Sequence, residues 1–122
     1  MKSTVEQIQA RFDQDVERFS SLETGHTALT DSLLMLDLLT QAAAAVTPQA
    51  ESLLDIGCGA GNYSLKMLSV LPDLHVTLVD LSQPMLDRAQ ARLRLATQGS
   101  ITALQADVRD LPLPAEQFDI IL

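Results

Sequence analysis

Cysteine, aromatic residues and positive charge are all scarce in this chain of 122 residues. Its single cysteine, Cys58, cannot form a disulfide within the chain, which favours a reducing compartment. Aromatic residues make up only 3% of the sequence, so the expected core is aliphatic. A formal net charge of −8 argues against the broad basic surface that nucleic-acid binding needs. The composition therefore indicates a globular protein with no strong nucleic-acid signal.

The chain also lacks a long uninterrupted apolar run. The longest such stretch, 33–46, is broken by Asp37, Thr40 and Gln41 and is too short to span a bilayer. The first residues, 1–6, are polar and charged and do not resemble a signal peptide. These absences predict a cytoplasmic protein without a membrane segment.

Several chemistry-bearing patterns are missing as well. His26, His75 and Cys58 do not have the spacing of metal ligands, so no metal site is predicted. Neither a nucleophile-elbow sequence nor a Walker-type lysine motif is present.

Hydrophobic spacing divides the chain into two parts. Apolar residues three and four positions apart predict an amphipathic helix over 4–20. A second helix is predicted over 27–46, with Leu29, Leu33, Leu36 and Leu39 on one face. From residue 49 onwards, short apolar runs alternate with helical patterns. The predicted strands are 52–56, 76–80, 101–105 and 118–122, and the helices between the first three strands are 62–70 and 84–96. Strands separated by helices predict parallel βαβ units and an α/β fold.

The most informative segment is 53–64, which reads LLDIGCGAGNYS. An apolar run and an acid precede three glycines at every second position, and a helical pattern follows. A strand that feeds a glycine-rich turn into a helix N-terminus is a typical binding place for nucleotide-like ligands. Glycine lets the backbone approach the ligand closely, and the helix end offers unpaired N–H groups. The dinucleotide spacing G-x-G-x-x-G would require glycine at Asn62, which disfavours an NAD-linked enzyme.

An acidic residue lies near, at or just after the end of each of the first three predicted strands. Asp55 lies near the end of the first strand, Asp80 ends the second, and Asp107 follows the third. Because ligands bind at the carboxyl ends of strands in open parallel sheets, the three acids are expected at one edge. An acid at Asp80 can accept hydrogen bonds from both hydroxyls of a ribose.

Each acid also has a purely structural alternative. Asp55 could cap nearby backbone N–H groups, and Asp107 could simply begin a loop, with Asp110 as a competing candidate for its role. Asp80 could be the N-cap of the following helix, although Ser82 already supplies that signal.

The motif and its surroundings resemble the class I S-adenosylmethionine (SAM)-dependent methyltransferases. The resemblance covers 53–122, which is 70 of the 122 residues, and includes the link DLPLPAEQFD at 110–119. It implies a doubly wound, Rossmann-like parallel sheet, with strand order 3-2-1-4 for the part present, preceded by two N-terminal helices. On this reading, 1–48 is a helical cap or lid and 49–122 is the SAM-binding domain, which is expected to be truncated in its fourth strand.

The same resemblance implies a cofactor site. In the family, the residue matching Asp55 faces the methionine amino group and the residue matching Asp80 binds both ribose hydroxyls. Leu81 would pack on the adenine, with ordinary loop packing as its alternative, while Asp107 and the N–H of Val108 would contact adenine nitrogens. Cys58 is included as a small side chain that fits the turn. The expected SAM-binding residues are Asp55, Gly57, Cys58, Gly59, Gly61, Asp80, Leu81, Asp107 and Val108.

The implied function is transfer of the SAM methyl group to an unidentified acceptor, leaving S-adenosylhomocysteine (SAH). The acidic charge balance favours a small-molecule acceptor. No catalytic residue is assigned, because the family places acceptor contacts largely after the fourth strand. The alternative is a non-catalytic SAM- or SAH-binding or interaction module. Phe12, Phe19 and Tyr63 could touch the ligand from the lid, with core packing as the alternative for both phenylalanines. The exposed fourth strand predicts pairing with another chain.

Overall fold

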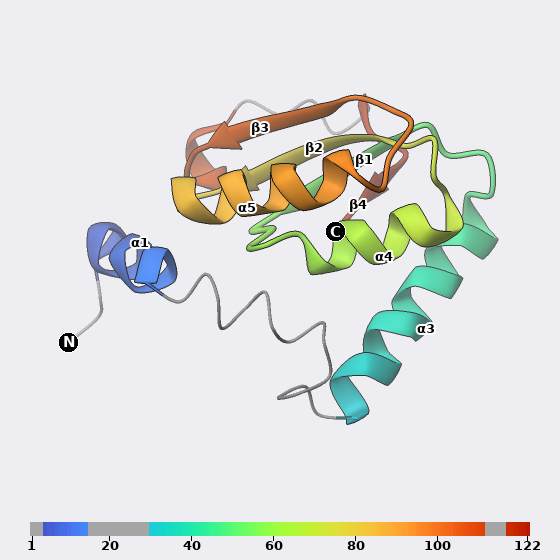
Figure 1. Cartoon of the computed structure of the whole chain (residues 1–122), viewed down its shortest axis with the longest axis horizontal. Coiled ribbons are helices and arrows are strands. Elements are labelled where there is room, and N and C mark those ends of the chain that lie inside the picture. The colour runs from blue at the N-terminus through green and yellow to red at the C-terminus, as the bar shows by residue number, and fades with distance from the viewer. Residues whose placement is uncertain (1–3, 15–29, 112–116) are drawn as a thin grey trace.

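The computed structural model describes residues 4–14, 30–111 and 117–122 (Figure 1), without the side chains of residues 12 and 30–33. Its elements are α1 (Val5–Gln14), α3 (Thr30–Val46), β1 (Ser52–Ile56), α4 (Asn62–Val70), β2 (His75–Asp80), α5 (Gln83–Arg94), β3 (Ile101–Gln105), the 3₁₀ turn η2 (Val108–Asp110) and β4 (Ile120–Ile121). Residues 15–20 of the first predicted helix and 27–29 of the second lie outside the described residues, as do 112–116 of the proline-containing link before β4.

The four strands form one parallel sheet in the order β3-β2-β1-β4. Ser52 of β1 lies opposite His75 of β2, which places the ends of these two strands level with each other. The predicted Rossmann-like sheet and its strand order are therefore confirmed.

β4 is shorter than the predicted strand 118–122. Its start is displaced because Asp119 turns towards β1, where its carboxylate accepts hydrogen bonds from the N–H of Glu51 at 2.8 Å and of Ser52 at 3.3 Å. Leu122 nevertheless continues the ladder, donating to the carbonyl of Leu54 at 2.8 Å.

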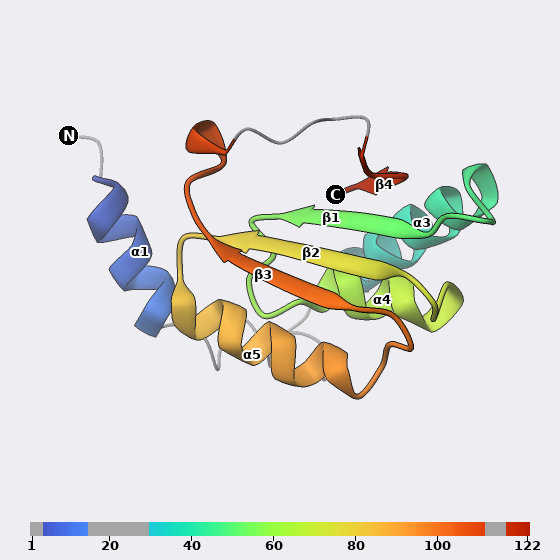
Figure 2. The same cartoon turned by 90° about the horizontal axis from the view of Figure 1, so that it is seen from above.

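Helices α3, α4 and α5 lie on one side of the sheet (Figures 1 and 2). They bury an aliphatic core against it, as the scarcity of aromatic residues predicts. Among the described residues, the buried cluster consists of Leu53, Cys58, Met67, Leu68, Leu74, Val76, Leu78, Leu86, Ala89, Leu93 and Ile120.

The inward face of α3 differs from the prediction. Leu39 is 44% exposed, whereas Thr40 is 2% exposed and Ala43 packs against the core. Helix α3 is apolar around most of its circumference, so the spacing of its leucines does not select one face. The buried Thr40 hydroxyl is satisfied within the helix, donating to the carbonyl of Leu36 at 2.7 Å. Smaller side chains thus meet α4, and Leu39 is left at the surface.

The first helix, α1, packs against α5 near the carboxyl ends of the strands (Figure 2). Its Asp13 carboxylate accepts a hydrogen bond from the hydroxyl of Ser82, the N-cap of α5. Across the described parts of the chain, no helix combines the length and the apolar character that crossing a membrane requires.

Candidate functional site

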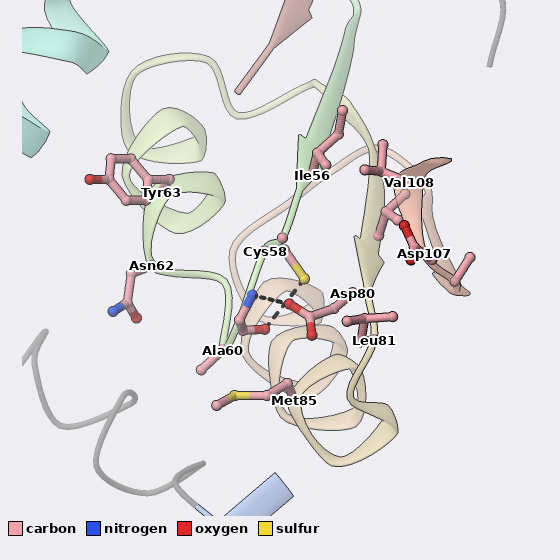
Figure 3. Close-up of a pocket in the computed structure, with 14 residues that line it drawn as sticks. Ile56, Cys58, Ala60, Asn62, Tyr63, Asp80, Leu81, Met85, Asp107 and Val108 are labelled. Carbon is pink, nitrogen blue, oxygen red and sulfur yellow. Dashed lines mark hydrogen bonds between the residues drawn. The ribbon is translucent and has the colours of Figure 1, made fainter. Parts of the chain in front are cut away.

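A pocket of about 400 Å³ opens at the carboxyl ends of β1, β2 and β3 (Figure 3). Three loops line it: the glycine turn after β1, the end of β2 with the start of α5, and the turn after β3. The lining residues are Ile56, Gly57, Cys58, Gly59, Ala60, Asn62, Tyr63, Val79, Asp80, Leu81, Met85, Ala106, Asp107 and Val108. All the predicted site residues belong to this lining except Asp55 and Gly61.

The three glycines of the turn all have a positive φ, of 66° at Gly57, 55° at Gly59 and 88° at Gly61. A Cβ added to Gly57 or Gly59 would meet nothing within 4 Å, so their backbone borders open space in the pocket. A Cβ on Gly61 would instead lie 2.9 Å from Cδ1 of Leu93 and 3.2 Å from Cβ of Ala89. The first two glycines leave room for a ligand, and the third lets the turn pack on α5.

Asp80 joins two of the loops and lies in the middle of the pocket (Figure 3). Its Oδ2 accepts a hydrogen bond from the N–H of Gly59 at 2.8 Å, and its Oδ1 accepts one from the N–H of Ser82 at 3.0 Å. Ser82 itself is the N-cap of α5, accepting from the N–H of Met85 at 3.3 Å, so the N-cap alternative for Asp80 is wrong. Because an ionised carboxylate offers about four acceptor positions, Asp80 retains capacity for ligand hydroxyls.

Asp55 lies beneath the glycine turn. Its side chain is buried and accepts a hydrogen bond from the hydroxyl of Ser64, in the first turn of α4, at 2.6 Å. Burial raises the pKa of Asp55 from 3.8 to about 6; the Ser64 hydrogen bond opposes this shift, and the nearby charge of Asp80 adds to it. The carboxylate therefore ties β1 to α4 from below the pocket. Ser64 was not predicted as a residue of the site. The only signal for it in the sequence is that a small polar residue stands at a buried position of a helix.

Cys58 contributes a buried thiol to the pocket wall. Its sulfur lies 3.3 Å from the carbonyl of Gly59, in donor geometry. Burial raises the pKa of the Cys58 thiol far above its ordinary value, and the charges of Asp55 and Asp80 act in the same direction. A thiol kept protonated in this way is inert as a nucleophile, in agreement with its interpretation as a small side chain that fits.

Asp107 begins the 3₁₀ turn at the rim. Its carboxylate accepts from the N–H and from Nε of Arg109, both at 3.0 Å. Hydrogen bonds from this arginine lower the pKa of Asp107 from 3.8 to about 2. Asp107 thus has the loop-starting role given as its alternative, and it also lines the pocket. The competing candidate, Asp110, is exposed and lies outside the lining.

Arg92 of α5 is bonded to the end of the glycine turn. Like the contact of Ser64, this contact was not predicted from the sequence. Its Nη1 donates to the carbonyl of Ala60 at 2.7 Å and to Oδ1 of Asn62 at 2.8 Å. Partial burial lowers the pKa of this guanidinium. No local sequence pattern reveals these contacts, because the partners lie at least thirty residues away in the chain.

The other unpredicted lining residues are neighbours of predicted ones, apart from Met85 in the first turn of α5. Tyr63, expected to contact a ligand, lines the pocket, while Phe19 and the side chain of Phe12 lie outside the described residues. Within the described ranges, no group of three or more His, Cys, Asp or Glu side chains could hold a metal ion.

Comparison with known proteins identifies the family. The family described as "Methyltransferase domain" matches residues 53–122, and the chain belongs to it. The chain is 41% identical over 70 residues to a ubiquinone/menaquinone biosynthesis C-methyltransferase of Syntrophotalea carbinolica, covering 57% of this chain and 29% of that protein. It is 33% identical over 104 residues to the 27-O-demethylrifamycin SV methyltransferase of Amycolatopsis mediterranei, covering 84% and 35% respectively. The chain therefore spans about a third of the length of these relatives.

The fold matches solved structures over nearly the whole chain. The magnesium protoporphyrin IX methyltransferase of Synechocystis PCC 6803, solved with bound SAH, has a TM-score of 0.73. The match covers 96% of this chain and 56% of that one at 17% sequence identity. At this identity the likeness establishes the shared fold.

Proposed function

We propose that the pocket binds SAM and that the chain is the cofactor-binding part of a methyltransferase acting on a small molecule. The observation that carries this proposal is the open backbone of Gly57 and Gly59 facing the carboxylate of Asp80. Family membership supports the same ligand, and relatives named for quinone and rifamycin methylation support a small-molecule acceptor.

The order of chemical groups along the pocket suits SAM. At one end, Gly61 is the N-cap of α4 and has no side chain to bond the first amides of the helix. Such a helix end favours a carboxylate, here that of the methionine moiety. Asp80 lies in the middle, where the ribose hydroxyls would bind. Leu81, Asp107 and Val108 lie on the far side from Tyr63, where the adenine would fit (Figure 3).

The bound cofactor would supply a methyl group on a positively charged sulfur. The residues of this chain would bind it, orient it and exclude water, which accounts for much of the rate in a reaction between two positioned partners. Asp55 lies below the lining, so its proposed interaction with the methionine amino group requires a bridging water. No residue of this chain is assigned to the acceptor.

The proposal extends to the surroundings of the site. Residues 1–48 would form a cap, in which α1 is joined to the start of α5 by the hydrogen bond between Asp13 and Ser82. The lone cysteine favours a cytoplasmic location, and the net charge of −8 favours a small molecule over nucleic acid. The edge position of β4 in the sheet makes it the surface for self-association.

Calorimetric titration with SAH, with NAD run in parallel, tests the proposed ligand. We expect saturable SAH binding and no NAD binding. Asp80→Asn should weaken SAH binding by roughly 2–3 kcal/mol, because ribose hydroxyls lose a charged partner. Asp110→Asn is the matched control at an exposed acid outside the lining.

The outcomes separate the alternatives. Absence of SAH binding by a folded sample refutes the proposed ligand, and an unchanged affinity in Asp80→Asn refutes the ribose assignment. SAH binding without methyl transfer by the whole protein, tested against quinone and rifamycin acceptors, would favour the non-catalytic binding module instead.

A further inference from the structure

Arg92 holds the peptide of the glycine turn that joins Ala60 to Gly61, the N-cap of α4. The carbonyl of Ala60 accepts from Arg92 at 2.7 Å, and the N–H at the other side of the same peptide, that of Gly61, donates to the carbonyl of Cys58 at 3.0 Å. Both polar groups of this peptide are therefore fixed, which sets the orientation of its plane. The next residue, Asn62, is held by the same Arg92 nitrogen at 2.8 Å.

Helix α5 also supports the turn between these two bonds. Gly61 lies so close to Leu93 and Ala89 that an added Cβ would be 2.9 Å and 3.2 Å from their side chains. Three consecutive residues, 60–62, thus rest on α5, and Arg92 donates hydrogen bonds to two of them, Ala60 and Asn62. The apolar contact sets the distance between the turn and the helix, whereas the guanidinium sets the orientation of the backbone.

The position of this charge is unusual for a helix end. A cation beside a helix N-terminus is unfavourable, because the N-terminus already carries a partial positive charge. Arg92 lies beside the first residue of α4, so its charge adds to that of the helix end. An anionic group of a ligand bound there would be stabilised by both.

We propose that Arg92 is a positioning residue for the amino-acid end of the bound cofactor. It orients the peptide between Ala60 and Gly61 and the side chain of Asn62, and thereby directs the first amides of α4 at a carboxylate. This inference rests on the proposed function, since it assigns Arg92 to one part of that ligand. It requires that Arg92 act on the amino-acid end and not on the adenosine end, where Asp80, Leu81 and Asp107 lie.

Two ligands separate the two ends of the pocket. SAH carries the carboxylate, while 5′-methylthioadenosine has the adenosine and sulfur without the amino-acid group. In Arg92→Gln we expect the Kd for SAH to rise about ten-fold or more, as for the loss of charged hydrogen bonds, with little change for 5′-methylthioadenosine. Arg92→Lys should recover part of the SAH affinity, because it keeps the charge but not the geometry of the guanidinium. Arg94→Gln, the same change at an exposed position of α5, is the control and should bind both ligands like the wild type.

Equal weakening of both ligands in Arg92→Gln would overturn the proposal, because it would indicate a general loss of pocket structure. Unchanged SAH affinity would overturn it as well. A wild-type chain that binds no SAH refutes the proposed function, and amide hydrogen exchange of the ligand-free protein then decides the role of Arg92. Faster exchange over 57–63 in Arg92→Gln, with unchanged exchange in β2, would show that Arg92 orders the turn without that ligand, and unchanged exchange over 57–63 refutes its positioning of the turn.

Discussion

The buried carboxylate of Asp55 makes a quantitative prediction about stability and pH. Asp55→Asn replaces a titratable group by a neutral one of nearly the same shape. The asparagine Oδ1 can still accept the hydrogen bond that the Ser64 hydroxyl gives to Asp55 at 2.6 Å. Its NH₂ group adds buried donors, and an unpaired donor costs about 1–3 kcal/mol. That cost does not depend on pH, so the pH dependence of the difference between the two proteins isolates the carboxylate.

The sign and size of this pH dependence follow from the pKa of Asp55. Burial raises this pKa from 3.8 to about 6, so the folded state retains the proton over a range where the unfolded state has lost it. The stabilising effect of the proton is complete below pH 3.8 and is lost as the pH rises through about 6. At about 1.4 kcal/mol per pH unit, the whole effect is roughly 3 kcal/mol. The part of this effect that is lost between pH 5 and pH 8, a range away from the isoelectric point near 4.4, is about 1.4 kcal/mol.

Urea unfolding followed by circular dichroism measures this difference, since the chain has no tryptophan and one tyrosine. The free energy of unfolding of the wild type should fall by about 1.4 kcal/mol relative to Asp55→Asn between pH 5 and pH 8. Asp73→Asn, at an exposed acid, should keep the wild-type pH dependence. A difference between wild type and Asp55→Asn that stays constant over this range would refute the reasoning, whatever its absolute value.

The glycine turn provides the remaining predictions. Gly61→Ala should destabilise the fold by roughly 2–5 kcal/mol in urea unfolding, because the left-handed backbone and the contact with Leu93 both oppose a Cβ. Gly57→Ala should cost only about 1–2 kcal/mol, yet raise the Kd for SAH at least ~ten-fold by filling the pocket; equal stability losses in the two variants would contradict this division. Cys58 should react with a disulfide reagent at pH 8 more slowly than a free thiol by about ten-fold or more, and SAH should slow it further. Rapid labelling in the folded state would contradict its burial.

The sheet could be predicted from the sequence because its signals are local. Apolar runs that alternate with helical patterns predict parallel strand pairing. The glycine turn indicates that the strand before it is the first of the βαβ units. The predicted range 52–56 agrees with β1 because both ends have clear signals: Pro48 ends the preceding helix, and Gly57 begins the turn. By contrast, 118–122 became a two-residue strand, because the pairing of Asp119 with the backbone of Glu51 depends on a distant segment.

The direction in which each site residue points could not be predicted from the sequence. Asp55 and Asp80 both end or nearly end a strand, yet one side chain lies under the turn and the other lies in the pocket. Asp55 lies opposite Leu78, two residues before Asp80, so both side chains point to the same side of the sheet. The difference follows from their positions along the strands and from the partners available, Ser64 in one case and the N–H groups of Gly59 and Ser82 in the other. The motif predicts where the site lies, whereas the packing of α4 and α5 decides which of its residues can reach a ligand.

The division among the glycines shows why one motif carries two kinds of constraint. Gly57 and Gly59 need a small residue because a ligand would occupy the space beside them, a requirement set by binding. Gly61 needs one because Leu93 and Ala89 already occupy that space, a requirement set by packing. Without a ligand, a side chain at the first two positions would meet only the strain of a positive φ, whereas at the third it would also meet α5. Packing therefore accounts for Gly61, whereas the open space beside Gly57 and Gly59, with Asp80 facing it, is what a binding site adds to the backbone requirement.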